Sequence, residues 1–73
     1  MVPIPVVSSL LSAAAYDDER QELHLTFKSG ALWIYGSAGQ PFTQADADNF
    51  AGASSAGQFF LSQIKGNWPE RRG

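Results

Sequence analysis

The sequence offers few side chains that could carry out covalent or acid–base chemistry. It contains one histidine, His24, and no cysteine. A single imidazole in a predicted strand lacks a second positioned titratable group, which general acid–base catalysis needs. Ser54 and Ser55 precede a predicted helix, where serine side chains cap the first turn, and no neighbouring base marks either as a nucleophile. We therefore expect no catalytic residue and no enzymatic activity.

Two acidic stretches could bind a cation. The run Asp17–Glu19 could form a weak cation site, but a solvated turn is the favoured interpretation. The stretch that begins at Asp46 starts like a calcium-binding loop, yet it carries Phe and Ala where that loop requires a ligand and a glycine. Gly36 and Gly39 match neither glycine-rich phosphate-binding pattern. We therefore expect no metal site and no cofactor.

Length and charge restrict the remaining functions. The 73 residues are enough for one small domain, and their 44% hydrophobic content is enough for a compact core. Without cysteine, neither a disulfide nor a zinc–thiolate site can stabilise that core. The formal net charge of −2 argues against the strong attraction to phosphate that drives non-specific nucleic-acid binding. Binding to another protein is the class of function that composition leaves open.

The first seven residues predict an extended apolar arm. Pro3 and Pro5 exclude a helix between Val2 and Val7 and favour an extended segment or an edge strand. The arm either packs on its own domain or docks on a partner. It has no basic region before the apolar residues and is too short to span a bilayer, so we expect neither signal peptide nor anchor. The expected location is the cytoplasm.

The centre of the chain predicts a β-hairpin. Apolar and polar residues alternate over 23–28, and segment 8–16 fits a preceding strand better than a short helix. A three-residue loop, Lys28-Ser29-Gly30, would place Trp33 and Tyr35 on the face of Leu25. A two-residue loop would instead move both aromatic residues to the face of His24. The three-residue loop is favoured, and it leaves Leu32 and Ile34 on the opposite face.

Two helices are predicted after the hairpin. Thr43 is a good N-cap with Asp46 as an imperfect capping-box partner, and this helix ends near Ala51. Ser55 caps a second helix, which ends at Gly66. The predicted fold is α+β, a three-stranded antiparallel sheet followed by two helices in the order β-β-β-α-α. Residues 8–68 form one domain, within which Trp68 could fold back on the core, and 69–73 form a disordered basic tail.

Two binding hypotheses follow from this arrangement. In the first, the arm, the uncovered sheet face and the basic tail contact a protein; the residues are Val2, Ile4, Val6, Val7, Leu32, Ile34, Arg71 and Arg72. In the second, aromatic and basic side chains bind RNA or a single strand by stacking and charge; the residues are Trp33, Tyr35, Lys28 and Lys65. The acidic net charge favours the first.

Several motifs recur in the order seen in a known family. They are Val7-Ser8-Ser9, Ala15-Tyr16-Asp17, Leu23-x-Leu25-x-Phe27-x-Ser29-Gly30-x-x-Trp33-x-Tyr35, Ala53-Ser54-Ser55-x-Gly57-x-Phe59-Phe60 and Ile64-Lys65. Over about residues 6–68 the chain resembles the KTSC domain, named for the C-terminus of some lysyl-tRNA synthetases. Trp33 stands where the family has the first tyrosine of a Tyr-x-Tyr pair. Pro41 follows a longer glycine-rich loop than is usual in the family.

The resemblance implies a function that the residues alone do not. Stand-alone members of the family exist, and this chain is similar to one that a lytic phage encodes as a transcription regulator. That similarity implies a non-enzymatic inhibitor of transcription initiation, which binds the large subunits of bacterial RNA polymerase in the host cytoplasm. RNA binding, suggested for the family, is the alternative.

Overall fold

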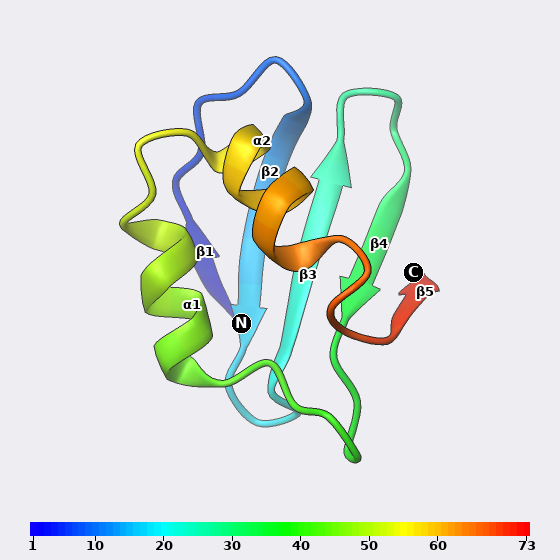
Figure 1. The fold of residues 1–73 in the computed structure, drawn as a ribbon. Helices are drawn as coiled ribbons and strands as arrows, with labels where there is room; N and C mark the ends of the chain where they lie inside the picture. The colour runs from blue at the N-terminus through cyan, green and yellow to red at the C-terminus, as the bar shows by residue number, and fades with distance from the viewer.

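The computed structural model describes residues 1–73 as an α+β domain. A single antiparallel sheet has the strand order β1-β2-β3-β4-β5, and the helices cover one of its faces (Figure 1). The strands are β1 (Val2–Ile4), β2 (Leu11–Asp17), β3 (Glu22–Phe27), β4 (Leu32–Tyr35) and β5 (Glu70–Arg72). The helical segments are α1 (Gln44–Ala51), α2 (Ala56–Phe59) and η1 (Phe60–Ile64), the last a π-helix that continues α2.

The predicted fold class is confirmed, but the predicted number of strands is wrong. The two additional strands lie at the edges of the sheet, where β1 pairs with β2 and β5 pairs with β4. The arm contributes β1, and Ile4 is buried in the core. The segment expected to be a disordered tail contributes β5. Its sequence, Glu-Arg-Arg, has no apolar alternation, so the period-2 signal that indicates a strand is missing.

The hairpin register agrees with the three-residue loop. Leu25 faces Trp33 and Leu23 faces Tyr35 across β3 and β4. Gly30 adopts a φ of 94°, the left-handed conformation that glycine tolerates best. The amide of Phe27 donates to the carbonyl of Ala31, which closes the loop. The predicted assignment of the aromatic pair to the helix-covered face is therefore confirmed.

Local capping determines where the helices begin. The Thr43 side chain accepts from the Asp46 amide, and the Asp46 carboxylate accepts from the Thr43 amide, so both halves of the capping box form. The Ser55 hydroxyl accepts from the Gln58 amide. In η1 the Lys65 amide donates to the Phe60 carbonyl at 2.8 Å, five residues back. Neither helix is long and apolar enough to cross a membrane.

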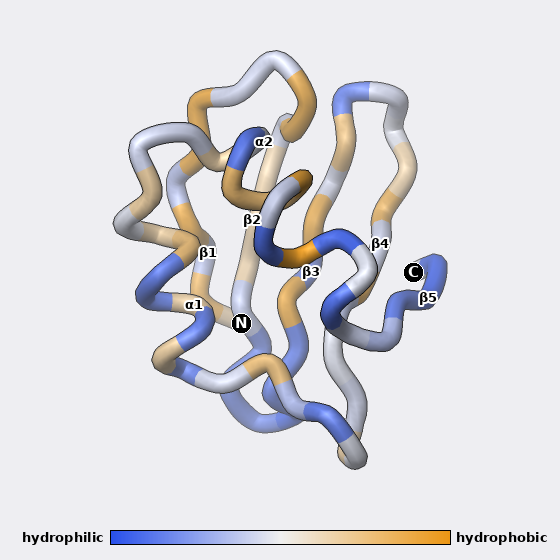
Figure 2. Tube along the Cα trace, viewed as in Figure 1, coloured by the Kyte–Doolittle hydropathy of each residue, from blue (hydrophilic) through white to orange (hydrophobic).

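The core lies between the sheet and the helices. Hydrophobic residues lie within β2, β3 and the α2–η1 segment, whereas the turn after β2 and strand β5 are hydrophilic (Figure 2). Phe60 packs edge-on against both Phe27 and Tyr35, with ring centroids 5.3 and 5.5 Å apart. Trp68 folds back on Phe42 at 4.7 Å. Aromatic contacts thus join η1 to β3 and β4, and separately join the segment before α1 to the segment that leads into β5.

A close backbone approach occurs at Gly36, just after β4. Its φ is 110°, and a Cβ there would lie 2.9 Å from the Gln21 carbonyl oxygen and 3.0 Å from the Phe42 nitrogen. We expect Gly36→Ala to destabilise the fold by about 1–3 kcal/mol from the backbone conformation, with a further cost from these contacts. Urea denaturation measures the change.

Substitutions at two other glycines distinguish the cost of the backbone conformation from the cost of the close contacts. Gly30→Ala has the same positive φ but open space around the added methyl, so it should cost less than the change at Gly36. Gly39→Ala has neither feature and should be close to neutral. A Gly36→Ala variant no less stable than Gly30→Ala would contradict the close approach.

The stability of the core should depend on pH in the alkaline range. Burial, with a smaller contribution from the charge of Glu70, raises the pKa of Tyr35 to about 12 from an ordinary value of 10.0. Because the folded state holds this proton more tightly, the stabilisation is complete below pH 10 and is lost as pH rises through 12. We expect the urea midpoint to fall across that window, and to fall less in Tyr35→Phe. Equal slopes in the two proteins would show that Tyr35 is not responsible.

Candidate functional site

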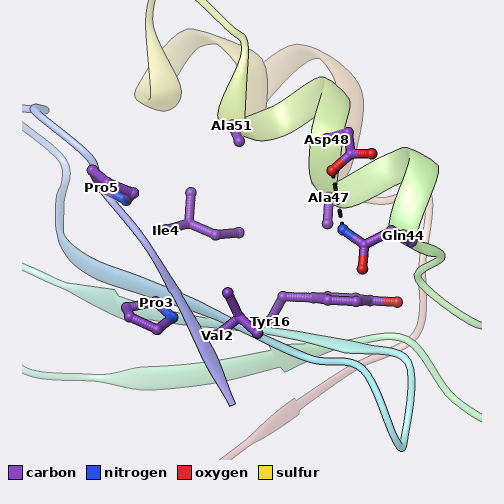
Figure 3. A pocket seen from close by; sticks show the side chains of 9 residues that line it. All are labelled: Val2, Pro3, Ile4, Pro5, Tyr16, Gln44, Ala47, Asp48 and Ala51. Carbon is purple, nitrogen blue, oxygen red and sulfur yellow. Dashed lines mark hydrogen bonds between the residues drawn. The ribbon is translucent and has the colours of Figure 1, made fainter.

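An apolar groove lies between β1 and α1, at one edge of the sheet (Figure 3). Its volume is about 190 Å³. Val2, Ile4 and the two prolines of the arm form one wall, Ala47 and Ala51 of α1 form the other, and Tyr16 lies between them. The groove exists because β1 pairs with β2 at the edge of the sheet and α1 lies beside this edge (Figure 1). The arm therefore belongs to its own domain and still presents an open surface.

The end of the groove is acidic. The Tyr16 hydroxyl donates a 2.7 Å hydrogen bond to the Phe42 carbonyl. Burial raises the pKa of Tyr16, and the charges of four nearby carboxylates, those of Asp17, Asp18, Asp46 and Asp48, add to this effect. At the rim the Gln44 amide group donates to the Asp48 carboxylate at 3.0 Å. The groove therefore combines an apolar lining with one carboxylate, that of Asp48, and with negative charges near Tyr16.

The residues predicted to bind a protein partner do not form one surface. Val2 and Ile4 line the groove, Val7 is 98% exposed in the loop that follows β1, and Val6 packs partly against the core. Leu32 lies on the opposite, helix-free face of the sheet and is half-buried.

The remaining residues predicted to bind a protein partner, Ile34, Arg71 and Arg72, lie in or next to strand β5. Ile34 is only 7% exposed because β5 pairs alongside it and Gly73 lies against its side chain. This chain therefore covers Ile34 itself, which weighs against Ile34 as a contact residue while β5 is in place. Arg71 forms an ion pair within the domain, and the guanidinium of Arg72 lies 5.3 Å from the centre of the Trp33 ring.

The residues predicted to stack on bases are also separated. Tyr35 is 2% exposed, so its ring faces are not available for stacking. Trp33 is half-buried beneath Arg72. Lys65 lines the same hollow as Trp33, whereas Lys28 is exposed in the hairpin loop. Of the four residues predicted to bind a nucleic acid, only Trp33 and Lys65 lie together on the surface.

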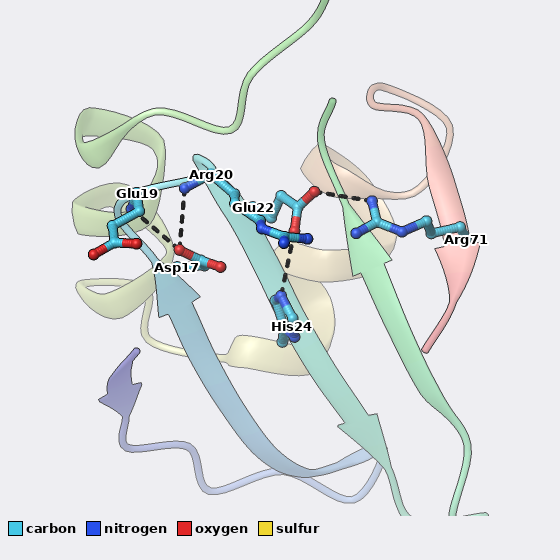
Figure 4. A network of polar contacts seen from close by, with 6 residues as sticks. All are labelled: Asp17, Glu19, Arg20, Glu22, His24 and Arg71. Carbon is cyan, nitrogen blue, oxygen red and sulfur yellow. Dashed lines mark hydrogen bonds and ion pairs between the residues drawn. The ribbon is translucent and has the colours of Figure 1, made fainter. Parts of the chain in front are cut away.

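A polar cluster on the helix-free face was missed by sequence reasoning. Asp17, Glu22 and His24 come together there, with one ligand-type atom from each within 4.8 Å of the others (Figure 4). The sequence grouped Asp17 with its neighbours in the turn. The structure instead pairs it with Glu22 across the β2–β3 connection, while His24 lies two residues further along β3. A prediction of the β2–β3 register, which pairs Asp17 with Glu22, would have indicated the cluster.

Glu22 is the buried member of this cluster. Its side chain is 8% exposed, and Arg71 of β5 donates to its Oε2 at 2.9 Å. That hydrogen bond holds the pKa of Glu22 below its ordinary value, against the opposing effect of burial. Its Oε1 lies 3.5 Å from the His24 Nε2, too far for a good hydrogen bond, and both atoms are buried without a hydrogen-bond partner.

The architecture defines a small α+β domain whose antiparallel sheet carries helices on one face only. The profile of the KTSC domain matches residues 7–68, and the chain belongs to the KTSC domain family. The structure is similar to the crystal structure of a KTSC domain protein from Yersinia pestis, with a TM-score of 0.84 and 28% sequence identity. That similarity covers 97% of this chain and 94% of the other. A comparison with curated proteins finds no match.

The Tyr16 hydroxyl should contribute to stability, because its hydrogen bond is buried. We expect Tyr16→Phe to lower the free energy of unfolding by about 1–3 kcal/mol, since it leaves the Phe42 carbonyl without its partner. Tyr35→Phe is the matched control at neutral pH, because the Tyr35 hydroxyl makes no hydrogen bond. Thermal denaturation of both variants measures the difference, and equal stabilities would contradict the assignment.

Proposed function

We propose that this domain is a non-enzymatic regulator that binds another protein through the groove between β1 and α1. The observation that carries the proposal is the combination of an apolar groove with the carboxylate of Asp48 in its lining. The negative charges of Asp17, Asp18 and Asp46 also act on Tyr16 in the groove floor. Val2 in its wall is 53% exposed, although valine is usually buried. A protein surface that places an apolar side chain next to basic residues complements this groove in shape and charge.

The size of the groove limits what it can accept. A closed cavity of about 150 Å³ holds one benzene molecule. The groove, at about 190 Å³, therefore fits one aromatic or branched aliphatic side chain of a partner. Lysine or arginine residues flanking that anchor would meet the carboxylates, which would accelerate association and exclude acidic partners.

Bacterial RNA polymerase is the partner that we propose to test first. The choice rests on the similarity of the sequence to one phage-encoded member of the family, not on the family as a whole, and the expected result of binding is inhibition of transcription initiation in the bacterial cytoplasm. A nucleic-acid contact through Trp33 and Lys65 is the competing proposal. The burial of Tyr35 and the net charge of −2 weigh against it.

A pair of charge substitutions on α1 tests the groove. Ala51 lines the groove and is exposed, so Ala51→Lys should fold normally and place a long basic side chain in the binding surface. Ala45→Lys adds the same charge on an exposed position of the same helix outside the groove. Because the lysine at 51 would obstruct the apolar lining and repel basic residues of the partner, we expect Ala51→Lys to weaken binding to purified RNA polymerase by about 10-fold or more, and Ala45→Lys to leave it nearly unchanged.

The measurement is a direct titration of polymerase with the full chain. Removing residues 1–7 is not suitable, because β1 and Ile4 belong to the fold. Equal weakening by both substitutions would place the contact elsewhere. Absence of polymerase binding would end the partner assignment, and quenching of Trp33 fluorescence by an oligonucleotide at low salt would favour the nucleic-acid alternative.

A further inference from the structure

We propose that Asp17, Glu22 and His24 form a binding site for a divalent transition-metal ion, with Zn²⁺ as the ion that fits best. The three side chains lie together on the helix-free face (Figure 4), and this inference does not depend on the proposed function. A group of acidic residues is common on protein surfaces and would not by itself indicate a ligand. Two buried atoms without partners distinguish this cluster.

Glu22 and His24 face each other in a buried contact that is too long for a good hydrogen bond. Glu22 is more than nine-tenths buried, and its Oε1 meets only the buried Nε2 of His24, in an ion pair that requires a protonated imidazole (Figure 4). A buried polar group without a partner costs free energy that most native structures avoid. The two atoms point at each other from 3.5 Å. A cation between them would accept a lone pair from each.

The spacing of the cluster approaches that of a tetrahedral zinc site. Tetrahedral zinc has bonds to imidazole nitrogen and carboxylate oxygen of about 2.0–2.2 Å, which separates neighbouring ligand atoms by roughly 3.4 Å. The separation of 3.5 Å between Glu22 Oε1 and His24 Nε2 matches this spacing. The three ligand atoms lie within 4.8 Å of one another, so one carboxylate must approach by up to about 1.4 Å. Asp17 is the member best able to move, because it ends β2 at the start of a polar turn.

Hydrogen bonds from the protein hold both carboxylates in place. The amides of Glu19 and Arg20 donate to Asp17 Oδ1 at 3.1 Å, and Arg71 donates to Glu22 Oε2. In each carboxylate one oxygen is fixed by a protein donor and the other is left for a ligand. Such outer-shell hydrogen bonds orient ligands in metal sites.

The donor set selects the kind of metal. One imidazole nitrogen and two carboxylate oxygens suit Zn²⁺ and other first-row ions, whereas Mg²⁺ and Ca²⁺ prefer oxygen ligands throughout. Solvent on the helix-free face would supply the fourth ligand. A bound ion would join the ends of β2 and β3, and through the Glu22–Arg71 pair it would also strengthen the attachment of β5.

The composition leaves few competing metal ligands in the chain. His24 is the only histidine and there is no cysteine, so the chain provides one imidazole and no thiolate. Zn²⁺ is titrated into the full chain without a histidine tag, in a non-chelating buffer, with calorimetry as the readout. We expect one equivalent to bind and the thermal unfolding midpoint to rise. Mg²⁺ and Ca²⁺ at the same concentration should have little effect.

Three substitutions decide whether the cluster is the site. His24→Gln and Asp17→Asn should each weaken Zn²⁺ binding by about 10-fold or more. Asp18→Asn removes the same charge from the same turn without touching the cluster, and it should bind like the native protein. Circular dichroism confirms that each variant folds, and Asp17→Asn keeps the test valid if the His24 variant does not fold.

Spectroscopy gives an independent readout. Co²⁺ in place of Zn²⁺ should give the intense visible absorption of a four-coordinate ion, and Zn²⁺ should shift the nitrogen resonances of the His24 ring. The proposal is overturned if the native chain binds no Zn²⁺ at millimolar concentration. It is also overturned if His24→Gln binds as tightly as the native chain, or if Asp18→Asn weakens binding as much as Asp17→Asn.

Discussion

The pairing of β3 with β4 is the constraint on which the rest of the structure depends. Because the loop between them has three residues, Leu23 and Leu25 lie beside Tyr35 and Trp33 on one face. The helices pack on that face, with Phe60 between the aromatic rings of the sheet. A shift by one residue would exchange the two faces, put the aromatic rings on the side of His24 and leave the helices without a matching surface.

Local signals in the sequence were enough to predict this arrangement, and non-local ones were not. Glycine at a loop position, alternating residues in β3 and the capping residue Thr43 each act over a few positions, and the structure contains all three features. Strand β5 has no local signal, because its glutamate and two arginines show no apolar alternation and it pairs with β4, a strand far away in the sequence. The cluster around Glu22 depends on register across a turn, which neither composition nor spacing indicates.

The two faces of the sheet have different physical characters. The helix-covered face is closed by aromatic packing, apart from the groove where α1 and β1 diverge. The opposite face has no helix and carries small residues together with the buried carboxylate of Glu22. A buried charge is tolerated there because Arg71 reaches it from the next-but-one strand. The same ion pair therefore links the centre of the sheet to its C-terminal edge.

Strand β5 also determines which part of the domain opens first. It has three residues, all exposed, and it joins the sheet across a long intervening segment, so its amides should exchange with solvent well before those of β2 and β3. Its detachment requires no disruption of the Phe60 cluster. The partly open state would retain four strands and the helices, but it would uncover Ile34 beside Leu32. An apolar strip thus lies under the last residues of the chain. The free energy of local opening, which includes the loss of the Glu22–Arg71 ion pair, determines how often that strip is exposed to water.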